Sequence, residues 1–221
     1  LYFGAGSYLG QLDLRDGSVA VLANLGDTEI EEVGSFGDEQ LLLSVFGPVN
    51  RKDTFRLMYY ELDSGGRATL IHGRHGRYLP QPEALIYDDG AYLNVRLYGD
   101  SAMRELPVIQ HRFGASARIL PVSDTRFLYS IDPDKAISSF DVELQESKPL
   151  AELSARCGLD GAIWIAERAA VLCKRQEDVP DYALISLDGT VEGVLNIPDA
   201  RRFRALAYLA DQDALVLTEE W

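Results

Sequence analysis

Short apolar runs alternate with polar turns along this chain, and one apolar run returns at a nearly constant interval. The runs are rich in Val, Ile, Leu, Tyr and Phe and are bounded by Gly, Asp, Pro and Ser clusters, which is typical of strands joined by tight turns. The recurring run starts near Leu1, Leu41, Ala84, Phe127, Ala169 and Ala214. A period of about 42 residues that contains only strands predicts the blades of a β-propeller.

We therefore predict an all-β chain, with a single β-propeller domain over residues 1–221 and blades of four antiparallel strands. No segment sustains a 3.6-residue apolar stripe over three turns, so almost no helix is expected. The segment 200–209 is the one place where a helix competes with a strand. The last strand of the fourth blade is expected at 149–153.

The phase of the repeat favours six blades. The first blade lacks its innermost strand, and the last one stops after two strands, so both chain ends supply the second strand of a blade. A propeller closes by building one blade from both ends, which hides the sheet edges. Because the ends overlap rather than complement each other, we expect six blades and a chain that is incomplete at one or both ends. Five blades with one displaced end strand is the alternative.

The composition argues against a nucleic-acid or membrane partner, and it does not decide whether the two cysteines are bonded. The formal net charge is −14, from 35 acidic and 21 basic residues. A chain this acidic repels phosphate backbones, so we expect no nucleic-acid partner. No apolar stretch is long enough to span a membrane, so no membrane insertion is expected. Cys157 and Cys173 form a disulfide in an oxidising compartment or remain two buried thiols in a reducing one.

Catalytic and metal-binding motifs do not emerge from the sequence. The glycine-rich stretch Gly4–Gly10 has Ala5 and Leu9 where a nucleophile elbow requires glycines. Three histidines without metal-ligand spacing do not predict a zinc site. We therefore assign no catalytic residue, no metal and no cofactor, and a non-catalytic role is favoured over an enzyme.

Charge placement supplies the one candidate site. The loops that lead from the outer strand of one blade to the inner strand of the next hold all three histidines and eight arginines, against four acidic residues. These loops share one face of a propeller, and the residues that enter the inner strands surround its axis. Guanidinium groups gathered there suit a carboxylate or phosphate ligand. The candidate ligand-binding residues are His75, Arg77, His111, Arg112, Arg118, Arg156, Arg201 and Arg202.

A structural role for these arginines is the competing interpretation. In that case the guanidinium groups pair with acids of neighbouring loops, such as Asp89, Asp134 and Asp178, and hold the blades together.

Two segments carry a resemblance to a known repeat. Tyr8–Gly17 reads YLGQLDLRDG and Met58–Gly66 reads MYYELDSGG. These strand-and-turn sequences resemble the bacterial TolB-like, WD40-like β-propeller family. The resemblance implies a toroid that binds partners, often in the periplasm, and it carries over no catalytic residues. On this resemblance alone, an extracytoplasmic location is favoured over a cytoplasmic one.

Three functions remain open at this point. The first is a non-catalytic binding module that recognises a protein, an acidic peptide or another anionic ligand at the axial loop face. The second is a propeller-based enzyme or the propeller domain of a larger hydrolase. The third is a structural scaffold subunit. The oligomeric state is not predicted.

Overall fold

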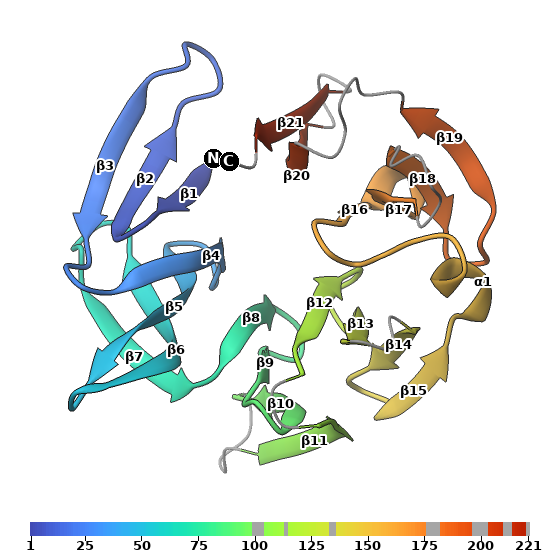
Figure 1. The fold of residues 1–221 in the computed structure, drawn as a ribbon, viewed down its shortest axis with the longest axis horizontal. Coiled ribbons are helices and arrows are strands. Elements are labelled where there is room, and N and C mark those ends of the chain that lie inside the picture. Colours follow the sequence, from blue (N-terminus) through green and yellow to red (C-terminus); the bar gives the residue numbers. More distant parts are fainter. Residues whose placement is uncertain are drawn as a thin grey trace. The chain divides into compact units, whose positions relative to one another are not determined.

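A computed structural model describes residues 1–98, 104–112, 115–132, 136–175, 182–195, 203–209 and 214–219. The described chain is built from antiparallel sheets whose strands follow one another in sequence order. It divides into two compact units, Leu1–Ala115 and Ser116–Trp221. The all-β fold with four-stranded antiparallel blades confirms the expected β-propeller class (Figure 1).

The first unit contains three sheets. The first sheet consists of β1 (Tyr2–Ala5), β2 (Tyr8–Leu12) and β3 (Val19–Asn24). The second consists of β4 (Glu29–Ser35), β5 (Gln40–Val49), β6 (Lys52–Glu61) and β7 (Arg67–His72). The third consists of β8 (Arg74–Leu79), β9 (Ala84–Asp88), β10 (Tyr92–Leu97) and β11 (Arg104–Gln110).

Glycine allows a close approach where the third sheet lies against the second. A Cβ atom on Gly76 of β8 would meet the Leu57 side chain of β6 at 2.7 Å. The Gly76 N–H instead donates a hydrogen bond of 3.1 Å to Oγ of Ser44, a buried residue of β5. This contact fixes the start of β8, which carries Arg74, His75 and Arg77.

Leucine, tyrosine and other apolar side chains fill the spaces between these sheets. Leu9 of β2 packs with Ile30, Leu43 and Tyr60 between the first two sheets. A second cluster joins the second and third sheets and contains Leu42, Leu57, Leu85 and Tyr87. Every residue of β9 is buried, as expected for a strand covered on both faces.

The second unit contains two complete sheets and one strand pair. The first sheet consists of β12 (Ala117–Pro121), β13 (Arg126–Ile131), β14 (Ile137–Asp141) and β15 (Glu146–Pro149). The second consists of β16 (Ile163–Ile165), β17 (Ala170–Lys174), β18 (Tyr182–Ser186) and β19 (Val191–Leu195). A short helix α1 (Ala151–Ser154) and a 3₁₀ turn η1 (Ala166–Arg168) lie in the connections, and β20 (Phe203–Leu209) pairs with β21 (Ala214–Glu219).

A disulfide bond joins the two cysteines inside the core of the second unit. Cys157 and Cys173 are bonded to each other and are fully buried. They pack with Leu128, Leu153 and Val171. Of the two states that the sequence leaves open, the structure therefore has the paired one.

The strands amount to five blades, so the expectation of six is wrong and the five-blade alternative holds. Four sheets have four strands each, while β1–β3 and β20–β21 are partial sheets with five strands between them. That number supplies one further blade and not two. The repeat overcounted the blades because each partial sheet contains one copy of the recurring run, β1 in the first and β21 in the second.

Two local expectations were also tested. The fourth blade ends at Pro149, and 151–154 form α1 instead of the expected strand 149–153. Proline lacks a backbone N–H, so it closes the strand there and the chain turns into the helix. Of the segment 200–209, the described residues Phe203–Leu209 form the strand β20 and not a helix.

Candidate functional site

The eight candidate residues are distributed over both units. His75, Arg77, His111 and Arg112 belong to the first unit, and Arg118 and Arg156 belong to the second. Arg201 and Arg202 lie outside the described residues. The ring of cations as a whole therefore stays a prediction, and each unit is described by itself.

Glu32 of β4 contacts two of the candidates. His75 Nδ1 lies 3.0 Å from one carboxylate oxygen, and an Arg77 guanidinium nitrogen lies 2.7 Å from the other. Burial by itself raises the pKa of Glu32, but the Arg77 charge and the hydrogen bond from His75 outweigh it and hold the pKa well below its usual range. Arg77 also donates to the Gly76 carbonyl oxygen at 2.8 Å.

The backbone of His75 is part of this arrangement. His75 has a positive φ of 54°, an uncommon conformation for a residue with a side chain. The pairing of β8 with β9 is irregular between Arg74 and Arg77. The side chains of His75 and Arg77, two residues apart in β8, reach the two oxygens of one carboxylate.

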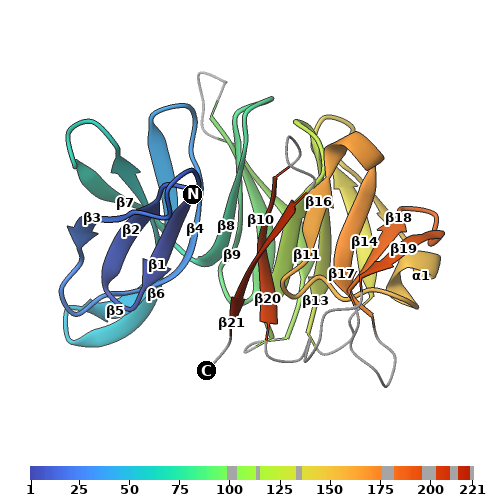
Figure 2. The ribbon, with the colours of Figure 1, turned by 90° about the horizontal axis from the view of Figure 1, so that it is seen from above.

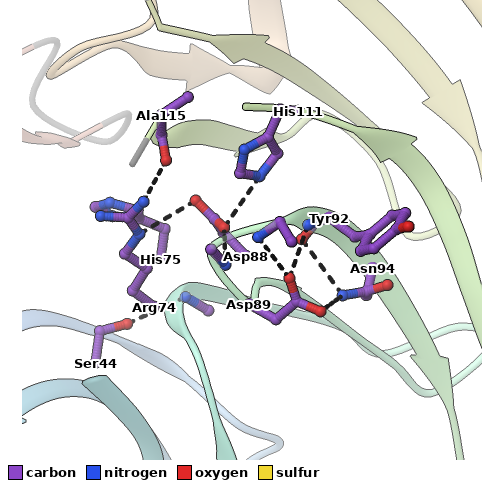
Figure 3. Close-up of polar contacts among 12 residues, drawn as sticks. Ser44, Arg74, His75, Asp88, Asp89, Tyr92, Asn94, His111 and Ala115 are labelled. Atoms are coloured by element: carbon purple, nitrogen blue, oxygen red, sulfur yellow. Dashed lines mark hydrogen bonds and ion pairs between the residues drawn. The ribbon is translucent and has the colours of Figure 1, made fainter. Parts of the chain in front are cut away.

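Asp88, at the end of β9, contacts a second pair of one arginine and one histidine (Figure 3). Arg74 Nε lies 3.2 Å from one carboxylate oxygen, and His111 Nε2 lies 3.2 Å from the other. The second oxygen also accepts a 2.6 Å hydrogen bond from the Gly90 N–H. Asp88 is fully buried and the His111 side chain is 2% exposed, so this contact is out of water.

Arg74 connects this cluster to its surroundings. Its guanidinium group donates to the carbonyl oxygen of Ala115 and lies over the ring of Phe55, 5.4 Å from the centroid. Both contacts use the planar guanidinium group, which stacks on aromatic rings and donates in its own plane. Arg74 therefore serves the packing of the first unit.

Asp89 was considered as a partner for an arginine, but in the structure its carboxylate binds groups of its own turn. Its carboxylate accepts hydrogen bonds from the N–H groups of Ala91 and Tyr92 and from the Asn94 side chain, at 2.7–3.0 Å (Figure 3). It thus orders the turn between β9 and β10. Asp134 and Asp178 lie outside the described residues. The carboxylates that contact His75, Arg77 and His111 are Glu32 and Asp88.

The sequence pattern does not predict Glu32 and Asp88 as partners of the candidate residues, and the reason is geometric. The pairing of β4 with β5 shifts between Ile30 and Glu32, which leaves Glu31 as an extra residue. A bulge of this kind breaks the alternation that assigns side chains to faces. Asp88 reads as an ordinary Asp-Asp-Gly turn, and only its full burial sets it apart.

The candidates of the second unit lie in a more open environment. Arg118 Nε is 3.6 Å from a carboxylate oxygen of Asp160, and these side chains are 31% and 76% exposed. Arg156 follows α1 and is exposed. Within the described part of the chain, no carboxylate lies at ion-pair distance from Arg156 or from Arg112, which is also exposed. Arg112 and Arg156 therefore face water, and Arg118 is partly exposed.

The described residues show no other chemical centre. Among them, no group of three or more His, Cys, Asp or Glu side chains is placed to hold a metal ion. In the same residues, no helix is both long and apolar enough to cross a membrane. Exposed guanidinium groups can bind carboxylate or phosphate oxygens, and this is the chemistry that the second unit offers.

The comparison with known proteins identifies the fold. No protein family matches the sequence, and no curated protein does so either. Among solved structures, TolB from Acinetobacter baumannii is similar with a TM-score of 0.64 at 13% identity, over 86% of this chain and 49% of TolB. The chain thus spans about half the length of that protein. The resemblance to TolB-like, WD40-like propellers is confirmed at the level of the fold.

Two further structures match less closely. An oligogalacturonate lyase from Vibrio parahaemolyticus aligns with a TM-score of 0.49 at 11% identity, over 86% of this chain and 61% of the lyase. A chain of the mitotic checkpoint complex aligns with a TM-score of 0.49 at 11% identity, over 100% of this chain and 83% of that one.

Proposed function

We propose that this chain is a non-catalytic β-propeller module that binds an acidic peptide segment of a protein partner. The arginines of the second unit are the proposed recognition groups. They are Arg118 and Arg156, together with Arg201 and Arg202, which the sequence assigns to the same kind of loop. The observation that carries the proposal is the Arg118–Asp160 pair at 3.6 Å, in which Asp160 is 76% exposed, together with the exposed Arg156.

Solvent exposure is what makes these groups available. An ion pair at the surface contributes between zero and about 1 kcal/mol, so an incoming carboxylate can replace Asp160 at little cost. Arg77, His75 and His111 are different, because each meets a largely buried carboxylate that no ligand can displace without leaving a buried charge. We therefore assign those three residues to the stability of the first unit.

The chain charge sets a requirement on the ligand. With a net charge of −14, the molecule as a whole repels an acidic peptide. Binding then depends on direct bidentate contacts with guanidinium groups, and moderate salt screens the repulsion over distances beyond about 10 Å. This combination favours a ligand that presents closely spaced carboxylates over a diffuse polyanion.

The Cys157–Cys173 bond supports an extracytoplasmic location for this module. Disulfides form and persist in oxidising compartments and are rare in the cytosol.

A titration with a fluorescent peptide of alternating Asp and Glu residues tests the proposal by anisotropy. We expect the double substitution Arg118→Ala/Arg156→Ala to weaken binding by about tenfold or more, since each lost charge-assisted contact contributes about 1.5 kcal/mol or more. Arg126→Ala/Lys148→Ala is the matched control, because it removes the same two positive charges from exposed positions of this unit.

Two results would overturn the proposal. One is equal loss of affinity in the control and the double variant, which would mean that the peptide senses net charge alone. The other is no binding by the unmodified protein at any salt concentration, which would favour the scaffold alternative.

A further inference from the structure

The outer edge of β3 lacks the protection that the other outer strands have. β3 reads Val-Ala-Val-Leu-Ala-Asn, with no charge and no proline. The last strands of the complete sheets, β7, β11, β15 and β19, each contain at least one charged residue, and β11 and β15 also contain proline. Natural proteins use such residues to keep an exposed edge from pairing with another chain. An edge without them is suited to pairing.

Exposed apolar side chains gather beside this edge. Val19 and Val21 are 62% and 66% exposed, and with Tyr8 and Leu14 they make up four of the nine exposed large hydrophobic residues among those described. The other face of the same sheet packs through Leu9 into the core of the first unit.

The backbone directions along β3 follow from its pairing with β2. The carbonyl of Ser18 accepts a hydrogen bond from the Asp13 N–H, so it points toward β2. Since backbone groups alternate in an antiparallel pair, the N–H and C=O of Val19 and Val21 point away from β2 while those of Ala20 point toward it. In the described residues, β3 pairs with β2 alone and is the edge of its sheet (Figure 2).

Further along the strand, a bulge at Leu22 changes this alternation, since Val21 pairs with Gly10 and Ala23 with Leu9, and the outer edge is already occupied there. The Leu22 carbonyl accepts a hydrogen bond of 3.2 Å from the Tyr60 hydroxyl, and the Asn24 carbonyl accepts one of 3.3 Å from Arg67. The open part of the edge is therefore its first half, centred on Ala20.

We propose that two copies of this chain associate by antiparallel pairing of their β3 strands across a two-fold axis at Ala20. In this register Val19 of one copy lies opposite Val21 of the other, and their outward N–H and C=O groups form the narrow hydrogen-bonded pairs of an antiparallel ladder. The four valines lie on one face of the joined sheet, where such cross-strand pairs stabilise it.

Charge explains why the occupant is a second copy. A two-fold interface brings each surface against itself, so a charged edge would repel its own copy while an uncharged one does not. In the proposed register Asp16 lies opposite Asn24 of the second copy, and no like charges meet. A basic or acidic partner would gain nothing from an edge without charges. The interface is shorter than a standard one, so the dimer is expected to be weak.

Cysteine cross-linking of the full 221-residue chain tests the register. The axis places the two Ala20 Cα atoms about 4.5 Å apart, within the range of a disulfide, while the two Val19 Cα atoms lie more than about 7 Å apart. We expect Ala20→Cys to form a covalent dimer under mild oxidation and Val19→Cys to remain largely monomeric. The native cysteines are buried and bonded to each other, so they do not compete.

Sedimentation equilibrium tests the association without added cysteines. We expect the unmodified chain to dimerise at high protein concentration, more strongly in high salt, because salt screens the net charge of −14. Val21→Lys should shift the chain to monomer. Val194→Lys is the control, since Val194 is an exposed apolar residue of the outer strand β19.

The proposal rests on the β3 edge and not on the anion site, so either can fail alone. It is overturned if the unmodified chain stays monomeric at all concentrations and the Ala20→Cys variant gives no cross-link. It is equally overturned if Val21→Lys and Val194→Lys have the same effect, or if Val19→Cys cross-links as readily as Ala20→Cys.

Discussion

The cationic side chains of the two units meet carboxylates in very different surroundings. In the first unit Arg77 and His75 contact Glu32, which is 15% exposed, and Arg74 and His111 contact Asp88, which is fully buried. In the second unit Arg118 meets the largely exposed Asp160 at a longer distance. The same residue types near the junctions between blades thus have different physical roles. Burial separates them, because a buried pair cannot be broken without leaving an unpaired charge.

The largest expected effect on stability comes from the buried Asp88 cluster of the first unit. Replacing Asp88 with Ala leaves Arg74 and His111 without their carboxylate, and His111 is almost completely buried. We expect the free energy of unfolding to fall by about 3–5 kcal/mol, as for other buried pairs that lose one partner. Urea denaturation measures this change.

Glu39→Ala provides the control, because Glu39 is an exposed acid of the same unit. If Asp88→Ala costs no more than this control, the buried cluster does not stabilise the fold.

An intermediate effect is expected from pH at Glu32. Its carboxyl pKa is lower in the folded chain than the value of about 4.3 in an unfolded one. A lowered carboxyl pKa contributes stability that is present above the unfolded pKa and is lost as the pH falls toward the folded pKa. Between about pH 5 and 3, the unmodified chain should therefore lose up to about 1.4 kcal/mol per pH unit relative to Glu32→Gln.

Parallel urea titrations of the two proteins across this range measure the difference. If their free energies of unfolding run parallel throughout it, then Glu32 does not carry the pH dependence.

The smallest effect on stability is expected at Asp160. Asp160→Asn should change the free energy of unfolding by less than about 1 kcal/mol, because the pair is exposed. The same change should strengthen binding of the acidic peptide, since it removes a competing carboxylate next to Arg118. Thermal or urea unfolding and the anisotropy titration give the two readouts.

Asp38→Asn removes one negative charge from an exposed position of the first unit and serves as the control for net charge. If both variants strengthen binding equally, the effect comes from the total charge and not from Arg118.

Much of the fold was predictable from the repeat, and the failures have local causes. The strands near Leu41, Ala84 and Ala169 form as expected, because a short apolar run between turn residues is typical of a buried strand. The turn glycines Gly17, Gly65 and Gly189 have the expected positive φ values of 73°, 69° and 86°. The strand expected at 149–153 failed because Pro149 ends the ladder just before the helix begins.

The candidate site was predictable only as a set of residues. Counting charges along the loops found His75, Arg77, His111 and Arg118 but could not find their partners. Glu32 contacts residues more than forty positions away, and a bulge decides which way it points. Alternation along one strand contains no information about either.

Local patterning therefore determines that this chain is all-β, that its strands recur about every 42 residues, and that its turns are glycine- and aspartate-rich, because each of these depends on neighbours in sequence. Tertiary structure decides the number of blades, the pairing of Cys157 with Cys173, and the division of the cations into buried and exposed ones. Those properties depend on which strands lie against each other and on how much water remains around each charged group. The neighbours of a residue in the sequence determine neither the packing of the strands nor this hydration.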